Sequence, residues 1–416
     1  MTVNDDKDAG AFLSLRLIPA ALTVLLLCIF GVAFIYSTGY IGDDYPVREN
    51  WIRQLFFIIA GIVLCVATLK IDYKGRFFKF AILGGYIISI FALILVIAYG
   101  HSTGGARRWL AIGGITIQPA EFAKIFTLLV CAYLIHLSKR WYLALPSVFN
   151  ALILPFLLIL MEPSYGNAFS IVGPVALMFL MRWHGSFTFA VLLALAFSCI
   201  ALSLSGLLWA RSTDGTAFFD KVAAHGAFGL REYHLKRLRS YVDPHGGWNE
   251  RQSIVTLASG GPYGKGYLQG TMKGLGFLPR TVAPSDFIFA VIGEELGFWY
   301  GCLPVILLYT LLFTMTLHWG AMAGDSLGMM ICCGGTALLF THVAVNVGMV
   351  VRLLPVIGLP LPFLSYGGSY ALATLLLLGV MASVPLHAES QQDSHTESTR
   401  RVFSIGKLFS IKIQSQ

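Results

Sequence analysis

Long apolar runs recur along the whole chain and restrict what it can fold into. A helix that crosses a bilayer needs about 20 consecutive apolar residues. We find ten such runs and predict an all-α polytopic membrane protein with about ten transmembrane helices. The run 287–317 is longer and contains Gly301 and Pro304, so we expect it to be tilted or broken. The runs cover residues 17–37, 52–69, 80–99, 120–138, 143–161, 166–183, 187–209, 287–317, 326–351 and 366–386.

Composition supports this prediction. Hydrophobic residues make up 56% of the 416 residues and charged residues only 12%, whereas about a quarter of a soluble domain is charged. The net charge of +8 is no sign of nucleic-acid binding here, because basic loops of membrane proteins set orientation or contact anionic lipids. We expect membrane lipids as partners and no nucleic acid. The cysteines and His342 lie in apolar runs, and we interpret them as packing residues rather than metal ligands.

Basic residues predict the orientation of the chain. They gather in the loops 70–79 and 139–140 and in the segment 400–412, which the positive-inside rule places in the cytoplasm. Both termini are then cytoplasmic, and the first run is a retained span. The loop of about residues 210–285 falls on the extracytoplasmic side, and its length indicates a function. Residues 387–416 are polar and then basic, and we expect a disordered cytoplasmic tail.

The first of three polar clusters lies where the fourth run begins. It joins Arg108 and Trp109 to Glu121 and Lys124. Glu121 and Lys124 are three residues apart and share a helix face, so they could form a local ion pair. Alternatively, Arg108 and Lys124 could bind an anion such as phosphate. Trp109 fits an interfacial anchor as well as it fits a binding site.

The second cluster opens the long run 287–317. Ser285 or Asp286 could cap that helix. An acid at this position, shielded from water, could also act as a general base. Glu294 and Glu295 lie about 12–13 Å deeper in the helix. We expect one of them to pair with a basic residue of another span, in a structural or gating role.

The third cluster is the segment 358–369, which reads GLPLPFLSYGGS and leads into the last run. Its prolines and glycines predict an extended or re-entrant loop. Ser365, Gly367 and Gly368 stand where backbone N–H groups at a helix start could receive a phosphate, although such segments are also ordinary turns. Arg352 is the nearest basic residue before this segment.

Together these clusters resemble the SEDS family (shape, elongation, division and sporulation). The resemblance covers about residues 50–386, so we expect residues 1–386 to form a single domain of this type. It is closer to the RodA branch than to the FtsW branch, through the runs GYLQGTMKGLGFLP and NVGMVVRLLPVIGLPLP. The motifs that carry the family resemblance are GARRWLAIGGITIQPAEFAK, SDFIFAVIGEELGF and LPVIGLPLPFLSYGGS.

The resemblance implies a peptidoglycan glycosyltransferase of the cytoplasmic (inner) membrane. Such enzymes polymerise lipid II at the outer face, release undecaprenyl pyrophosphate, and work with a class B penicillin-binding protein. It also implies that Asp286 is the catalytic acid of the DFIFA motif and that Arg108, Glu121 and Lys124 bind substrate. A divalent cation, Mg²⁺ or Mn²⁺, is a possible cofactor, with Glu121 as a possible ligand.

Two segments depart from the family pattern. The pattern QPDLGT reads EPSYGN here, so Ser164 stands in place of the acid, and Glu162 or Asn167 would have to substitute for it. The pattern LPE.HTDF reads LPRTVAPSDF, with Arg280 in place of the acid, no His, and a changed spacing. If the missing residues tune the base, activity would be altered or lost.

Two other functions compete with polymerisation. A flippase or transporter for the same lipid could use a basic cavity without a base, but it would need polar groups on both membrane faces. The predicted candidates instead gather on one face. A non-catalytic scaffold that activates a penicillin-binding protein is the third possibility, which the two altered segments keep open.

Overall fold

Transmembrane helices dominate the fold. The computed structural model describes residues 5–40, 49–103, 106–112, 115–162, 164–183, 247–279, 281–354 and 356–388. Within these residues, eight helical segments are long and apolar enough to cross a membrane. They are Leu17–Gly39, Asn50–Leu69, Arg76–Tyr99, Pro119–Leu137, Trp141–Met161, Ile288–Met322, Ser326–Val350 and Gly368–Ala388.

These segments confirm the polytopic membrane fold and eight of the ten predicted spans. The predicted span 166–183 is helical over residues 165–183, but it is not among the eight segments. The predicted span 187–209 lies outside the described residues, as do residues 210–246 of the large loop and 389–416 of the tail. The count of ten therefore stays a prediction.

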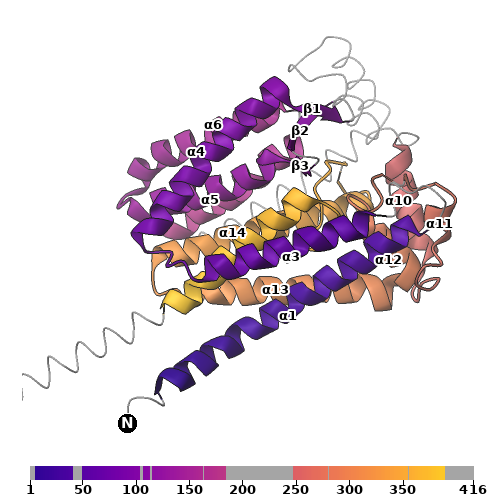
Figure 1. Cartoon of the computed structure of the whole chain (residues 1–416), viewed down its shortest axis with the longest axis horizontal. Helices are drawn as coiled ribbons and strands as arrows, with labels where there is room; N and C mark the ends of the chain where they lie inside the picture. Colours follow the sequence, from indigo (N-terminus) through magenta and orange to yellow (C-terminus); the bar gives the residue numbers. More distant parts are fainter. Residues whose placement is uncertain are drawn as a thin grey trace, which may run out of the picture.

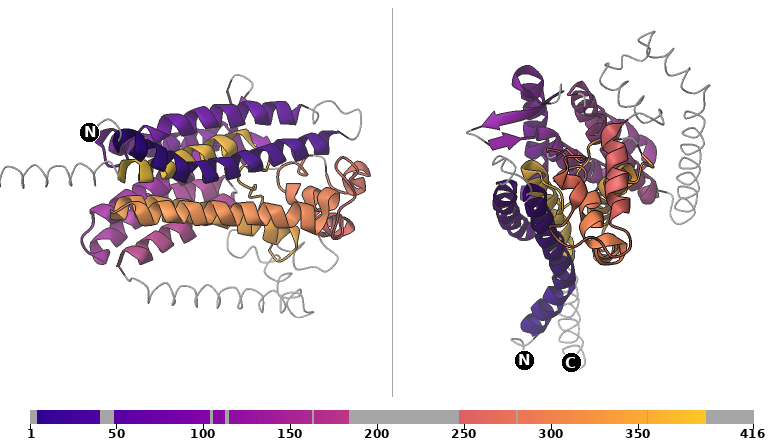
Figure 2. Two further views of the ribbon diagram at one scale, coloured as in Figure 1. Left: turned by 90° about the horizontal axis from the view of Figure 1, so that it is seen from below. Right: turned by 90° about the vertical axis from the view of Figure 1, so that its right-hand side faces the viewer.

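The helices run side by side along the long axis of the molecule (Figures 1 and 2). Helix α1 (Asp5–Gly39) begins at one end. The small strands β1–β3 and the short helices α10 (Trp248–Ser259) and α11 (Thr271–Gly274) lie at the other end. We call that second end the loop end, and all three polar clusters have residues there or near it.

Burial separates inner helices from peripheral ones. Most residues of α5 (Pro119–Leu137) and α14 (Ser326–Val350) are buried. By contrast, α3 (Asn50–Leu69), α4 (Arg76–Tyr99) and α6 (Trp141–Met161) expose many large apolar side chains. Lipid tails can cover these exposed side chains, since a bilayer solvates apolar surface.

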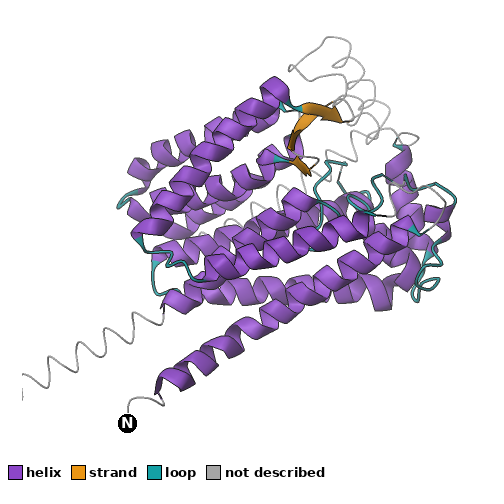
Figure 3. Ribbon diagram, in the orientation of Figure 1, coloured by secondary structure: helices purple, strands orange, loops and turns teal. Residues whose placement is uncertain are grey.

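A three-stranded antiparallel sheet interrupts the all-α pattern (Figure 3). The strands are β1 (His101–Thr103), β2 (Ala106–Ile112) and β3 (Ile115–Ile117). Trp109 pairs with His101, and Leu110 pairs with Ile117. The sequence predicted only a loop here, because three-residue strands are too short for an alternating pattern to be recognised.

The predicted break in the long run lies at Gly297. Helix α12 (Ile288–Gly297) passes through the π-helical turn η2 (Phe298–Cys302) into α13 (Leu303–Met322). Gly297 has φ of 73°, a value that glycine adopts without steric cost. The segment 260–266 bonds to the backbone around this break, through Lys265 N to Glu294 O at 3.0 Å and Phe298 N to Gly261 O at 3.0 Å. The freed backbone groups are thereby satisfied, as a membrane span requires.

Candidate functional site

The backbone around Asp286 is held by hydrogen bonds from distant parts of the chain. Tyr366 N donates to Pro284 O at 2.9 Å. Ser365 Oγ donates to Ser285 O at 2.6 Å, and Asn346 Nδ2 donates to Asp286 O at 3.0 Å. Three consecutive carbonyl groups are therefore fixed, and they hold the backbone that carries the half-buried Asp286 side chain.

The segment 358–369 packs against the loop that carries Asp286, and we call these two segments the two loops of the site. Ser365 bonds in both directions, because its Oγ also accepts from Leu361 N at 2.8 Å. Gly358 has φ of 77°, and a Cβ atom added there would lie 3.5 Å from Asp286 Oδ2. A larger side chain at position 358 would crowd the carboxylate, so glycine keeps the space beside it open.

Helix α14 connects Asp286 to the first polar cluster. Asn346 also donates to Leu359 O at 2.7 Å, so it joins the two loops. His342 lies one helical turn earlier on the same face, about 6 Å along the axis. Its Nε2 atom is 3.1 Å from Lys124 Nζ, and its Nδ1 atom is 2.9 Å from the Tyr370 hydroxyl group. The two clusters thus meet on one helix.

Lys124 is the centre of a fully buried polar cluster. Its ammonium group lies 2.9 Å from Glu121 Oε2 and donates to Asn167 Oδ1 at 2.8 Å. Lys124 is 2% exposed and Glu121 is 3% exposed. The ion pair predicted from the spacing is confirmed. Asn167 in turn donates to Ser164 Oγ at 3.1 Å, so the altered EPSYGN segment packs directly against this cluster.

Arg108 and Trp109 lie on β2, close to the end of α6. Arg108 Nε donates to the backbone carbonyl of Glu162 at 3.4 Å. Both Arg108 and Trp109 are half-buried. Burial raises the pKa of Glu162 to about 8, and the nearby Arg108 partly opposes this effect. Nothing in the sequence indicated that Arg108 contacts the EPSYGN segment, and sequence reasoning named Glu162 only as a substitute for the missing acid.

The glycine pair is less open than the sequence suggested. The N–H group of Gly367 already donates to Gln54 Oε1 at 3.0 Å. A Cβ atom on Gly368 would lie 2.4 Å from the ring of Phe57, so this glycine serves close packing. Arg352 follows α14 with φ of 59°, and its buried Nε has no hydrogen-bond partner among the described residues. A phosphate role for Ser365, Gly367, Gly368 and Arg352 stays a prediction.

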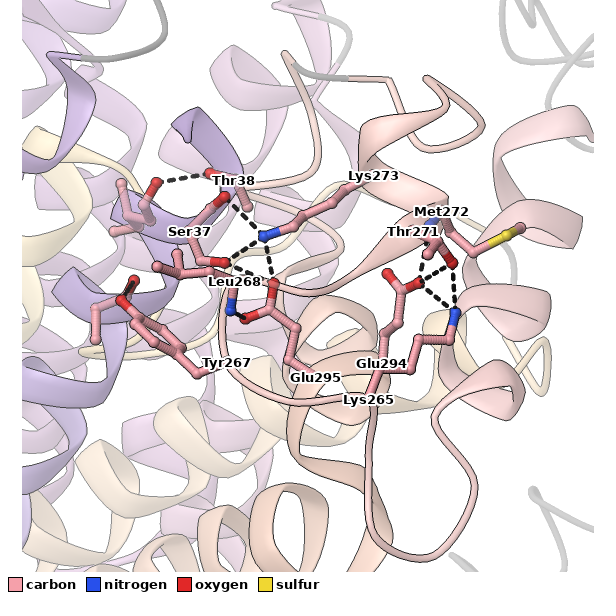
Figure 4. A network of polar contacts seen from close by, with 12 residues as sticks. Ser37, Thr38, Lys265, Tyr267, Leu268, Thr271, Met272, Lys273, Glu294 and Glu295 are labelled. Atoms are coloured by element: carbon pink, nitrogen blue, oxygen red, sulfur yellow. Dashed lines mark hydrogen bonds and ion pairs between the residues drawn. The ribbon is translucent and has the colours of Figure 1, made fainter. Parts of the chain in front are cut away.

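Both glutamates of α12 pair with lysines of the large loop rather than of another span (Figure 4). Lys265 Nζ lies 2.7 Å from Glu294 Oε1. Lys273 bonds to Glu295 Oε1 and to Ser37 of α1. Glu295 and Lys273 are 0% and 4% exposed. These contacts agree with a structural role for the two glutamates. The predicted partner, a basic residue of another span, was wrong, because both lysines belong to the large loop.

The surroundings of Glu121 do not suit a cation ligand. Its carboxylate is already neutralised by Lys124 at 2.9 Å, and an ammonium group so close repels a second cation. Among the described residues, no group of three or more His, Cys, Asp and Glu side chains could hold a metal ion. The divalent cation stays a sequence prediction.

Sequence reasoning missed three residues that organise the site. Asn346 bonds the two loops through Asp286 O and Leu359 O. Gln54 bonds the 358–369 segment through Ser365 O and Gly367 N, and Tyr370 contacts His342. Asn346 is the single polar residue of the stretch 343–351, and a lone polar residue in an apolar run is itself a sign of a function or of a buried hydrogen bond. That sign was available in the sequence for Asn346, whereas Gln54 follows Arg53 at the start of its run.

Comparisons with known proteins converge on one family. The profile described as "Cell cycle protein" (FtsW, RodA and SpoVE) matches residues 18–390. The peptidoglycan glycosyltransferase MrdB of Escherichia coli K12 is 34% identical over 388 residues, covering 89% of this chain and 93% of MrdB. The probable peptidoglycan glycosyltransferase FtsW of Bacillus subtilis is 30% identical over 385 residues, covering 89% and 90%. A solved chain from a peptidoglycan synthase complex superposes with a TM-score of 0.66 at 24% identity, covering 89% and 97%.

Proposed function

Because this chain belongs to the FtsW, RodA and SpoVE family, we propose that it is a peptidoglycan glycosyltransferase. It polymerises lipid II into glycan strands at the outer face of the cytoplasmic membrane. The single observation that carries this proposal is the position of Asp286. Asn346 bonds its backbone carbonyl group, and one helical turn away on α14 His342 contacts Lys124.

In the proposed reaction, the 4-hydroxyl group of the acceptor N-acetylglucosamine attacks C1 of the lipid-linked donor sugar. Asp286 removes the proton of that hydroxyl group as the new C–O bond forms. The bond from C1 to the diphosphate oxygen breaks, with inversion at C1, and undecaprenyl pyrophosphate leaves with the bonding electrons. Since pyrophosphate is a good leaving group, it needs charge stabilisation more than a strong acid.

Arg108 is the residue that we assign to the diphosphate. It lies on β2 and is half-buried, and a guanidinium group binds phosphate oxygens in a bidentate manner. Lys124 is buried and paired with Glu121, so its first role is to hold α5, α14 and the EPSYGN segment together. We propose that Lys124 acts on substrate through this support of neighbouring groups.

An apolar groove supports a lipid-linked substrate. It has a volume of about 570 Å³ and lies between α1 and α3, with Tyr267 at its edge. Leu55 lines the groove, while the adjacent Gln54 bonds to the backbone of the 358–369 segment through Ser365 O and Gly367 N. Helix α3 therefore presents one face to an isoprenoid tail and another to the loop that holds Asp286.

The proposal extends to the protein partner, to the role in elongation or division, and to the orientation in the membrane. The superposed chain comes from a complex described as coordinating polymerisation and crosslinking, and we propose a class B penicillin-binding protein as the crosslinking partner here. The RodA-like motifs and the similarity to MrdB favour a role in elongation. The basic loops predict that the loop end faces the cell exterior.

The test is lipid II polymerisation by the purified protein, alone and with its co-expressed penicillin-binding partner. Asp286→Asn should abolish glycan products without changing expression or the thermal unfolding temperature. Asp72→Asn is the matched control, because Asp72 lies in the turn between α3 and α4, where it accepts from Lys74 N at 2.9 Å. We expect this control to be fully active.

Other outcomes would favour the competing functions. Full activity of Asp286→Asn would exclude Asp286 as the base. If a folded wild-type complex makes no glycan but moves lipid II across vesicles, the flippase function replaces the proposal. If it does neither and still stimulates crosslinking by the partner, the protein is a scaffold.

A further inference from the structure

Glu162 ends α6, and its carboxyl group is buried without a partner. The residue is 1% exposed, and neither carboxyl oxygen has a hydrogen-bond partner among the described residues. Folded proteins pair almost all buried polar groups, so a buried carboxyl group with two unpaired oxygens calls for an explanation. Such a group either holds a proton or awaits a ligand.

The charges around Glu162 favour the protonated form. Arg108 from β2 is the charged residue that acts on the carboxyl group, and it lowers the pKa, but burial has the larger effect and raises the pKa to about 8. On α5, Glu121 and Lys124 neutralise each other at 2.9 Å. From the helix that follows, Asn167 and Ser164 bond to each other. Burial therefore favours the protonated form of Glu162 at neutral pH.

We propose that Glu162 is a neutral hydrogen-bond donor of the substrate site, which acts beside Arg108 on a phosphate oxygen of the lipid-linked donor. A protonated carboxyl group can donate a hydrogen bond, whereas a carboxylate only accepts and would repel a phosphate. The identity of the ligand rests on the proposed function.

A cation at Glu162 is the competing explanation, and the surroundings disfavour it. Mg²⁺ is usually held by one or two carboxylates together with phosphate oxygens. Arg108 already acts on the Glu162 carboxyl group as a nearby positive charge, and this charge would repel a cation bound there. In the part of the chain that the structure describes, no cluster of three or more His, Cys, Asp and Glu side chains surrounds it.

The first experiment is a pH profile of lipid II polymerisation for the wild type, Glu162→Gln and Glu162→Ala. The wild type should lose activity above about pH 8, as the carboxyl group ionises. Glu162→Gln should stay within about twofold of the wild type at neutral pH and should not lose activity at alkaline pH. Glu162→Ala should be about tenfold slower than the wild type at neutral pH and should show no alkaline loss of its own. Inactivity of Glu162→Gln, or an unchanged alkaline loss in it, would overturn the proposal.

The second experiment does not depend on polymerisation. Infrared difference spectra of the purified wild type against Glu162→Gln should show the C=O band of a protonated carboxyl group at neutral pH, and the band should vanish at alkaline pH. Glu49→Gln is the matched control, since Glu49 is exposed and paired with Arg53 at 3.6 Å, and it should remove no such band. An active wild type without the band refutes the role of Glu162 alone. A band in a protein that makes no glycan refutes the proposed function instead.

Discussion

Replacing Lys273 by Met tests whether the large loop is held to the membrane domain by a buried ion pair. The substitution removes the ammonium group that contacts Glu295 and Ser37, while Met fills a similar volume. Glu295 is 0% exposed, so its charge stays buried, and among the described residues Ser37 Oγ and Leu268 N remain as its donors. Removing one partner of a buried pair costs about 3–5 kcal/mol.

This cost predicts a measurable change in the unfolding temperature. Unfolding entropy is about 2.1 cal/mol/K per residue, or about 0.9 kcal/mol/K for this chain. The melting temperature should therefore fall by about 3–6 °C. The assay is thermal unfolding of the detergent-solubilised protein, followed by size-exclusion chromatography with tryptophan fluorescence.

Two further variants make this prediction refutable. The double variant Lys273→Met with Glu295→Gln removes both charges and should melt within about 2 °C of the wild type. Lys265→Met is the matched control, because the Lys265 side chain is 25% exposed and Glu294 keeps a bond from Met272 N at 2.8 Å. We expect a loss below about 2 °C there. The reasoning fails if Lys273→Met melts like the wild type. It also fails if the melting temperature of the double variant falls by the sum of the losses measured for Lys273→Met and for Glu295→Gln alone.

Three other substitutions test the site and its support. Lys124→Met should lower stability by about 3–5 kcal/mol, because it leaves Glu121 buried and charged; a fully stable variant would show that this pair does not support the fold. Asn346→Leu should slow polymerisation at least about tenfold, because the two carbonyl groups that it bonds are no longer fixed, and glycan yield is the measure. Gly264→Ala should cost more than about 2 kcal/mol in thermal unfolding, because its φ is 79° and its Cβ would lie 2.3 Å from a backbone oxygen. Gly276→Ala has a similar φ of 75° with nothing within 4 Å, so equal losses in the two glycine variants would contradict the clash.

The sequence predicted the features that depend on local information. Hydropathy located the spans, because each must be apolar over its own length. The spacing of Glu121 and Lys124 predicted their ion pair, which the structure confirms. Gly301 and Pro304 predicted a break in the long run, and it lies four residues before Gly301, at Gly297.

The remaining features depend on contacts between distant residues. Ser37 and Glu295 are 258 positions apart, and no local pattern indicates that they meet. The segment that carries Lys265 and Lys273 reads as a polar loop, although it packs against α12. Likewise, the departure LPRTVAPSDF changes side chains, whereas distant residues hold Pro284, Ser285 and Asp286 mainly through their backbone carbonyl groups. A comparison of motifs reads only side-chain identities, so it does not detect these hydrogen bonds to the backbone.

The break at Gly297 ties membrane insertion of the long span to the segment that precedes it. Two carbonyl groups, of Glu294 and Glu295, and two N–H groups, of Phe298 and Trp299, are bonded by residues 261–266. Each such group left unpaired in hydrocarbon would cost several kcal/mol. During synthesis, residues 261–266 leave the ribosome before the span does, so they can meet the break as soon as it enters the bilayer. The order of the chain therefore supplies the partner of the break before the break itself is synthesised.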